Sequence, residues 1–217
     1  MSTRESYRHG DLRRALVKAG TALARKGGPA AVVLREATRR AGVTAAAAYR
    51  HFADHQALLE AVCASAQALV AIAIEREQAE LTATGDPRED AIARFRAVGQ
   101  GYIRFARAEP NLFRTAFLPS QDLHGIDDPA RAGRTGKTPF RLLTSALDDL
   151  VVSGAMPPQR RTGAEFLAWS GVHGLATLAI DGPLRALDPK LTDMLTERVI
   201  DMVQEGLLIT PQAKGTS

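Results

Sequence analysis

Positively charged side chains are concentrated at the beginning of the chain. Residues 1–60 hold 11 Lys and Arg against 5 Asp and Glu, whereas the rest of the chain holds 17 against 19. Four of these arginines are Arg35, Arg39, Arg40 and Arg50. A guanidinium group donates several hydrogen bonds at once and pairs well with phosphate and with guanine. The charge distribution therefore predicts contact with a polyanion, and a solvated basic surface is the alternative.

Two short helices joined by a tight turn are predicted for residues 34–52, which read LREATRRAGVTAAAAYRHF. Glycine is favoured in the turn of a helix-turn-helix, and Gly42 occupies that place. The Thr44 side chain can cap the second helix, which is expected to reach about Phe52. A unit of this kind places its second helix in the major groove of DNA.

The second of these helices is unusual for a helix that reads DNA, because it contains four successive alanines. If Ala48 and Phe52 face inward, one turn apart, then Ala46 and Arg50 point outward. Alanine makes the helix slim enough to lie deep in the groove, and its methyl group can contact the methyl group of thymine. Specificity is then expected to depend on DNA shape, Arg35 and Arg50, with Arg50 bound either to a guanine or to a phosphate.

Other kinds of chemistry find little support in the sequence. It shows no nucleophile and base, no phosphate-binding loop and no metal-ligand spacing among its five histidines, so we expect no catalysis, no cofactor and no metal. The single cysteine, Cys63, excludes a disulfide within the chain and indicates a reducing, cytoplasmic location. The apolar run ALVAIAI is far shorter than the roughly 18 residues of a membrane span. The N-terminus has no apolar signal segment, so no membrane association is expected.

Helical periodicity and turn residues predict an all-α fold of about nine helices. The first helix is expected over residues 11–26, and Asp54 is expected to cap a long fourth helix. The segment 120–138 is rich in Gly, Pro and Asp and is expected to be a loop. Two long helices, roughly 159–181 and 189–208, are expected to end the chain.

Together these features resemble the TetR family of bacterial transcriptional regulators. The resemblance is carried by LREATRRAGVTAAAAYRHFADHQALLEAV, with its AGV turn, its YRHF box and its acidic helix start, and by the preceding helix that ends in ARKGG. Further along, FLAWSGVHGLATLAIDGPL resembles the branch with a WHG-type (Trp, His-Gly) ligand-binding domain. The resemblance implies an all-α homodimer, with a DNA-binding domain at 1–55 and a ligand-binding and dimerisation domain at 56–217.

The resemblance also implies which residues contact DNA. Thr44, Tyr49 and His51 correspond to phosphate contacts, although Tyr49 could instead belong to the core, and three of the alanines correspond to positions that face bases. His55 stands where the family usually has lysine, which predicts a weaker and pH-sensitive phosphate contact. Two further departures, Ala37 and Thr38, predict slightly loose packing of the first short helix. The candidates for DNA contact are Arg35, Arg39, Thr44, Ala45, Ala46, Ala47, Tyr49, Arg50, His51 and His55.

A group of aromatic side chains lies on the helices where the family has its effector cavity. As a group they indicate a mostly apolar site and hence a hydrophobic or aromatic small molecule, although each of them could instead be a core residue. The histidine among them is expected to be a satisfied interior residue rather than a metal ligand. The candidates for ligand contact are Tyr102, Phe105, Phe113, Phe117, Phe140, Trp169 and His173.

The last two predicted helices carry more apolar surface than packing within a monomer would bury. The helix at 159–181 is apolar nearly all round, and the helix at 189–208 has a wide apolar stripe, which predicts a two-fold dimer interface. The family resemblance then implies a repressor that binds a near-palindromic operator as a dimer and is released by a small-molecule effector. An activator, or a helical ligand-binding protein without a DNA role, is the alternative.

Overall fold

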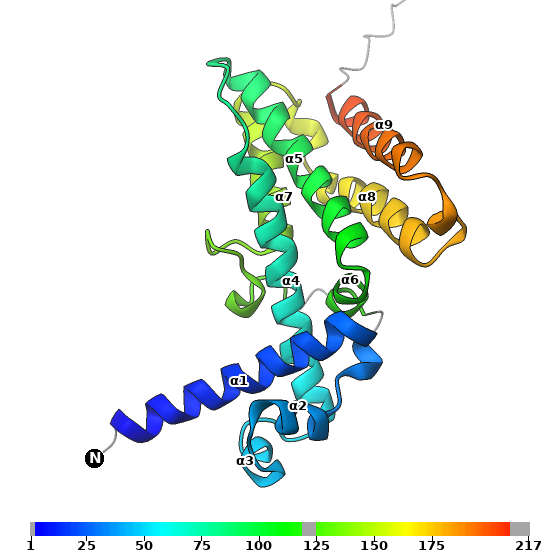
Figure 1. The fold of residues 1–217 in the computed structure, drawn as a ribbon. Helices are drawn as coiled ribbons and strands as arrows, with labels where there is room; N and C mark the ends of the chain where they lie inside the picture. The colour runs from blue at the N-terminus through cyan, green and yellow to red at the C-terminus, as the bar shows by residue number, and fades with distance from the viewer. Residues whose placement is uncertain (1–2, 119–124, 209–217) are drawn as a thin grey trace, which may run out of the picture. The chain divides into compact units, whose positions relative to one another are not determined.

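All regular structure is helical in the computed structural model, which describes residues 3–118 and 125–208 (Figure 1). Within these residues there are nine α-helices and no strand, which confirms the predicted all-α fold. The helices are α1 (Thr3–Gly27), α2 (Leu34–Ala41), α3 (Ala45–Tyr49), α4 (His55–Ala79), α5 (Pro87–Ala108), α6 (Pro110–Ala116), α7 (Pro139–Val152), α8 (Ala164–Ile180) and α9 (Pro189–Leu208).

The helix boundaries differ from the prediction mainly at two places. Helix α1 begins eight residues earlier than expected, at Thr3, because its polar first turns contain no proline to prevent a helix. Helix α3 ends at Tyr49, and the chain then tightens into a turn in which the N–H groups of His51 and Phe52 both donate to the carbonyl of Ala48, at 2.9 and 3.0 Å. The predicted loop is described from residue 125 onward and contains one short 3₁₀ turn, Pro129–Arg131.

The chain forms two compact units, each made of two segments. The first unit consists of residues 1–70 and 108–138, and the second of residues 71–107 and 139–217. Helix α4 contributes its first part to one unit and its last part to the other. The helix-turn-helix therefore lies in the first unit, together with α6.

In the first unit, α1 packs closely against the first part of α4. Gly20 makes this contact close, since a Cβ atom at this position would lie 2.5 Å from Cγ2 of Val62. The Thr21 hydroxyl donates to the Ser65 hydroxyl at 3.1 Å and adds a polar link between the same two helices. At the start of α4 the predicted cap is present, because Oδ1 of Asp54 accepts from the N–H of Ala57 at 2.8 Å.

Helix α4 is long and apolar enough to cross a membrane by length and composition alone, with a mean hydropathy of 2.0 over its best window. Half of that window is buried inside the protein. Leu58, Val62, Val70 and Ile74 are fully buried. Their spacing follows the helical repeat, so the apolar composition of α4 is accounted for by core packing.

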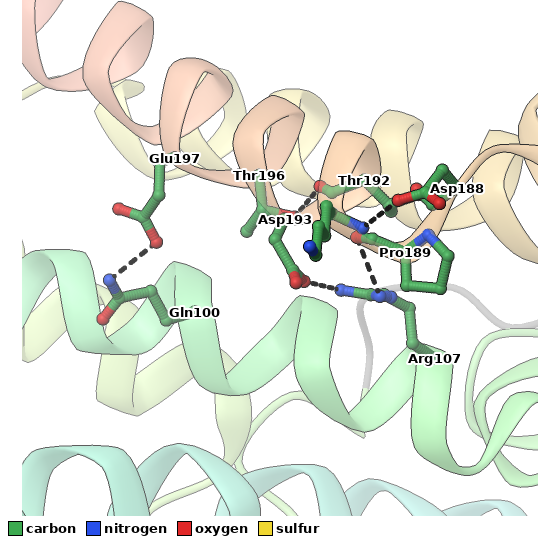
Figure 2. A network of polar contacts seen from close by, with 9 residues as sticks. Gln100, Arg107, Asp188, Pro189, Thr192, Asp193, Thr196 and Glu197 are labelled. Atoms are coloured by element: carbon green, nitrogen blue, oxygen red, sulfur yellow. Dashed lines mark hydrogen bonds and ion pairs between the residues drawn. The ribbon is translucent and has the colours of Figure 1, made fainter.

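In the second unit, α5 and α9 are joined by a row of polar contacts (Figure 2). Gln100 donates to Glu197 at 3.0 Å, and Arg107 pairs with Asp193 nearer the C-terminal end of α5. Arg96 extends the row with a second contact to Glu197, at 2.7 Å. Helix α8 packs on α9 in the same unit. These polar contacts link α5 to α9, and Tyr102 lies between Gln100 and Arg107 on α5.

Candidate nucleic-acid interface

The turn between α2 and α3 depends on the backbone of Gly42. Its φ of 68° lies in the left-handed region, which glycine adopts without steric cost. The N–H of Val43 donates to the carbonyl of Thr38 at 3.1 Å, and the N–H of Gly42 points to the carbonyl of Arg39 at 3.4 Å. These two bonds form a Schellman motif, which ends α2 and sets the direction in which α3 begins.

Helix α3 is held by its cap and by two buried side chains. Oγ1 of Thr44 accepts from the N–H of Ala47 at 3.3 Å, so the predicted cap is confirmed. Because the hydroxyl accepts in this contact, its proton remains available for donation to a phosphate. Ala48 and Phe52 are buried, as predicted, and the Arg13 guanidinium of α1 lies over the Phe52 ring, 5.4 Å from its centroid.

The opposite side of α3 presents a smooth surface with polar groups at its C-terminal end. Ala45 and Ala46 are exposed, and Ala47 is half-buried. Tyr49 has 58% of its surface exposed, which excludes the core position considered for it, and Arg50 next to it is exposed as well. This face therefore combines methyl groups with one hydroxyl and one guanidinium group.

The arginines of this region fall into two groups that differ in their partners. Nε and Nη2 of Arg39 donate to the two carboxylate oxygens of Glu36 at 2.8 and 2.6 Å, and Arg40 donates to Glu36 at 3.3 Å. Hydrogen bonds from Arg39 are the main cause that lowers the pKa of the Glu36 carboxyl to about 2. Arg35 and Arg50 are exposed and have no side-chain partner among the residues that the structure describes. These last two guanidinium groups can bind DNA without breaking an existing contact.

The two candidate histidines, His51 and His55, differ in their place in the fold and in their hydrogen bonding. His51 is half-buried at the end of α3. His55, at the start of α4, has Nε2 only 2.5 Å from the carbonyl oxygen of Val32, and because a carbonyl can only accept, this nitrogen must donate. A neutral ring then keeps no second N–H, so His55 can donate to a phosphate only when the imidazole is protonated.

Sequence reasoning missed Glu36 and Arg13. Glu36 lies three and four residues before Arg39 and Arg40, which is the spacing of helical ion pairs and could have indicated the contact. The contact of Arg13 with the Phe52 ring joins residues far apart in the sequence, and no local pattern indicates it.

Three of the predicted ligand contacts form a hydrogen-bonded cluster in the second unit. Nε1 of Trp169 donates to the Tyr102 hydroxyl at 3.0 Å, and that hydroxyl lies 2.8 Å from Nδ1 of His173. Burial lowers the pKa of His173 and raises the pKa of Tyr102, so both side chains are neutral at pH 7. The Tyr102 hydroxyl and Nδ1 of His173 are thus joined by a neutral hydrogen bond whose direction depends on the tautomer of the ring, and the His173 side chain is half-buried.

Aromatic rings extend this cluster. Phe140 lies edge-on to Trp169, with centroids 6.4 Å apart, and its ring is 6.1 Å from that of Phe166, a residue absent from the prediction. Phe105 is buried in the same unit. The two remaining candidates, Phe113 and Phe117, belong to the first unit, where their centroids lie 5.0 Å apart. The predicted ligand residues thus divide between the two units.

Within the described part of the chain, no group of three or more His, Cys, Asp or Glu side chains is arranged to hold a metal ion. Cys63 is buried, and burial raises the pKa of its thiol to about 12. The thiol is therefore protonated and unreactive at neutral pH.

Solved structures show the same arrangement of helices. A protein of unknown function from Rhodococcus sp. RHA1 is 28% identical, with a TM-score of 0.67 over 91% of this chain and 96% of the other. A protein assigned to the TetR family of transcription regulators from Shewanella sp. PV-4 is 16% identical, with a TM-score of 0.61 over 92% and 99% of the two chains. A second such protein, from Mesorhizobium loti MAFF303099, is 14% identical, with a TM-score of 0.57 over 93% and 99%.

Two family models match the chain, one in its N-terminal part and one in its C-terminal part. No curated protein matches the chain. Residues 16–62 match the model of bacterial regulatory proteins of the tetR family. These residues contain the whole helix-turn-helix. Residues 95–203, half of the chain, match the model of the tetracyclin repressor-like C-terminal domain. The chain therefore belongs to the TetR family and carries the DNA-binding helix-turn-helix of these transcriptional regulators.

Proposed function

We propose that this protein is a ligand-responsive repressor that binds a near-palindromic operator as a dimer. The observation that carries the proposal is the pair of unpartnered guanidinium groups, Arg35 and Arg50, on either side of the Gly42 turn. Residues 1–55 bind DNA in this proposal, and residues 56–217 bind the effector and the second copy. The protein acts in the cytoplasm and is not an enzyme.

DNA binding by α3 uses shape and charge more than direct base contacts. Ala45, Ala46 and Ala47 bring the helix axis close to the base edges and contact thymine methyl groups. Thr44, Tyr49 and His51, with the arginines, bind the flanking phosphates and fix the register of the helix. Arg35 and Arg50 supply the remaining specificity, since a bidentate contact with guanine discriminates by about 1–3 kcal/mol. Arg39 and protonated His55 add phosphate contacts.

Dimerisation through α8 and α9 is supported by the apolar side chains that these helices leave exposed. On α8, Leu167 is 67% exposed and Leu178 is 44% exposed, and on α9, Met194 and Met202 are 46% and 62% exposed. A second copy that covers this face would remove it from water. The Trp169 and His173-Gly174 pattern on α8 is the basis for proposing the WHG-type branch, whereas the C-terminal model that matches the chain is the tetracyclin repressor-like one.

The effector is a small, mostly apolar molecule that contacts the aromatic side chains. Tyr102, Trp169 and His173 supply polar anchors, and Phe105 and Phe140 supply apolar surface. The other two aromatic candidates, Phe113 and Phe117, lie in the first unit and form a separate aromatic pair. Release from DNA follows if the effector binds one conformation of the dimer more tightly than the DNA-binding one, by about 1–3 kcal/mol.

A fluorescence-anisotropy titration with DNA fragments from the region around the coding sequence tests this function. We expect one fragment to bind far more tightly than random DNA, with an affinity that falls steeply with salt. Arg88, an exposed arginine of the second unit, provides the matched control, because Arg88→Ala removes the same charge away from the helix-turn-helix. If no fragment binds more tightly than random DNA at moderate salt, the protein is not an operator-binding repressor.

A further inference from the structure

The guanidinium group of Arg13, on α1, lies beside the C-terminal end of α3. Its Cζ atom is 5.4 Å from the centroid of the Phe52 ring, and Phe52 follows Arg50 and His51 in the turn that ends α3. Helix α1 packs on both α2 and α3 within the first unit. Phe52 is only 2% exposed, whereas Arg13 is exposed, so the arginine forms the outer layer over this ring.

Contact with the ring leaves the hydrogen-bond donors of Arg13 available. A cation–π contact uses the face of the guanidinium group, whereas its five N–H bonds lie in the plane of the group. Among the side chains that the structure describes, no carboxylate pairs with Arg13. Arg25, on the same helix, differs because its Nε donates to both carboxylate oxygens of Glu109, at 3.1 and 3.0 Å. Arg13 is thus positioned by a ring and keeps its charge and its donors.

The position of Arg13 suits a phosphate at the edge of the groove in which α3 is proposed to lie. Helix α3 has five residues and is therefore roughly 7 Å long. The major groove is about 12 Å wide and is bordered by the phosphates of both strands. Because α3 is short, the residues that follow it, and a long side chain that packs on them, come within reach of a bordering strand. The exposed side chains of Tyr49 and Arg50 lie at the same end of α3.

We propose that Arg13 binds a DNA phosphate and extends the DNA-binding surface from the helix-turn-helix onto α1. The inference rests on the proposed function, because it adds a contact to the same DNA-binding surface. The Phe52 ring restricts the guanidinium group before DNA is bound, so less side-chain freedom is lost on binding. A phosphate carries no sequence information, so Arg13 strengthens binding to any DNA and fixes the position of α1 on it.

Replacements at Arg13 can separate its charge from its packing. Arg13→Met removes the charge and keeps an apolar side chain over the Phe52 ring. Arg13→Gln removes the charge and stays polar, and Arg13→Lys keeps the charge but loses the planar set of donors. Lys18→Met is the matched control, because Lys18 is exposed on the same helix. It lies about 140° around the helix axis from Arg13, away from the face that packs on α3.

Anisotropy titrations of the full-length protein, with random DNA and with the fragment that binds most tightly, test the proposal over a range of salt concentrations. Arg13→Met should weaken binding of both DNAs about tenfold and reduce the slope of log K against log salt by about 1 for each bound copy. Arg13→Gln should give the same change in slope. Arg13→Lys should keep the wild-type slope, and Lys18→Met should keep both slope and affinity.

The salt slope distinguishes a phosphate contact from a purely structural role of Arg13. If the slope is unchanged in Arg13→Met and Arg13→Gln, the proposal is overturned even where operator affinity falls, because the arginine then only supports the end of α3. A loss confined to the operator, with random DNA bound as by the wild type, overturns it as well. Random DNA reports on Arg13 whether or not any fragment is bound specifically, so failure of operator recognition and failure of this contact give different results. Thermal melts followed by circular dichroism check that each variant is folded.

Discussion

Glu36 holds Arg39 through two hydrogen bonds of 2.8 and 2.6 Å between neighbouring turns of α2. The same carboxylate accepts from Arg40, so one acid occupies two of the three arginines on this helix. Arg35 has no such partner in the described part of the chain. Contact of Arg39 with a phosphate would exchange one ion pair for another, whereas contact of Arg35 adds a new one.

Replacement of Arg35 should therefore weaken operator binding more than replacement of Arg39. We expect Arg35→Ala to cost about 1–3 kcal/mol and Arg39→Ala less than about 1 kcal/mol. Anisotropy titrations against the operator at one fixed salt concentration give both values. Equal losses for the two variants would show that Arg39 leaves Glu36 when DNA binds.

Removal of the Glu36 charge should strengthen binding of the protein to DNA of any sequence. Glu36→Gln releases Arg39 and Arg40 for phosphate contacts, so the slope of log K against log salt should steepen by about 1 to 2. Random DNA should gain as much as the operator, because phosphates carry no sequence information. The control is Glu60→Gln, which removes an exposed carboxylate from α4 in the same unit. An unchanged salt slope in Glu36→Gln would contradict the prediction.

Lowering the pH should not release Arg39 and Arg40 from Glu36 in this way. The pKa of Glu36 is depressed to about 2, so the ion pair is present above the ordinary value of 4.5 and is lost only as the pH falls toward 2. Between pH 5 and 8 the carboxylate stays charged and keeps Arg39.

The left-handed backbone at Gly42 should be required for DNA binding as well as for stability. Gly42→Ala is expected to lower the free energy of unfolding by about 1 kcal/mol, because a Cβ atom is strained at a φ of 68°. Gly42→Asn should lose less, since asparagine tolerates this conformation. Chemical denaturation gives the stabilities, and operator titration shows whether α3 keeps its direction. Full operator affinity in Gly42→Ala would mean that the turn does not position α3.

Local patterns were sufficient for the fold and for the helix-turn-helix. The turn at Gly42, the cap at Thr44 and the burial of Ala48 and Phe52 all depend on residues within a few positions of one another. Their conformational preferences and helical spacing can therefore be read from the sequence.

Contacts between distant residues could not be predicted in this way. His55 binds a carbonyl 23 residues earlier, and Trp169 reaches a hydroxyl 67 residues earlier, through packing that no short segment specifies. The first contact uses the N–H group that a neutral His55 would otherwise donate to a phosphate. The second makes Tyr102 part of a polar cluster, although its helical spacing indicates only an apolar face.

A charge on the exposed apolar face should separate the proposed dimer. Leu167→Asp places a carboxylate on α8 at a side chain that is 67% exposed, so the folded monomer should tolerate it. In a dimer the carboxylate would be buried without a partner, which should weaken association roughly a hundredfold or more. Analytical ultracentrifugation measures this change, and circular dichroism checks the fold. Val152→Asp, at a side chain that is 87% exposed at the end of α7, is the matched control and should remain dimeric.

The cluster around Tyr102 should make the stability of the second unit depend on pH. Burial lowers the pKa of His173, so the unfolded chain takes up the proton more readily. The stabilising contribution is therefore complete above the ordinary value of 6.5 and decreases as the pH falls below it. Thermal melts at pH 7.5 and 5.5 should show a lower Tm at the acidic pH, and His173→Gln should reduce the difference.

Tyr102→Phe separates this pH effect from the hydrogen bonds themselves. The substitution removes the hydroxyl that accepts from Trp169 and is hydrogen-bonded to His173, and leaves two polar groups without this partner. We expect a loss of about 1–3 kcal/mol at pH 7.5, where the imidazole is neutral in both states. Phe105→Leu, which alters a buried ring outside the hydrogen-bonded cluster, controls for loss of aromatic packing and should leave the pH dependence unchanged. A Tyr102→Phe variant as stable as the wild type would show that the hydroxyl contributes nothing to the fold.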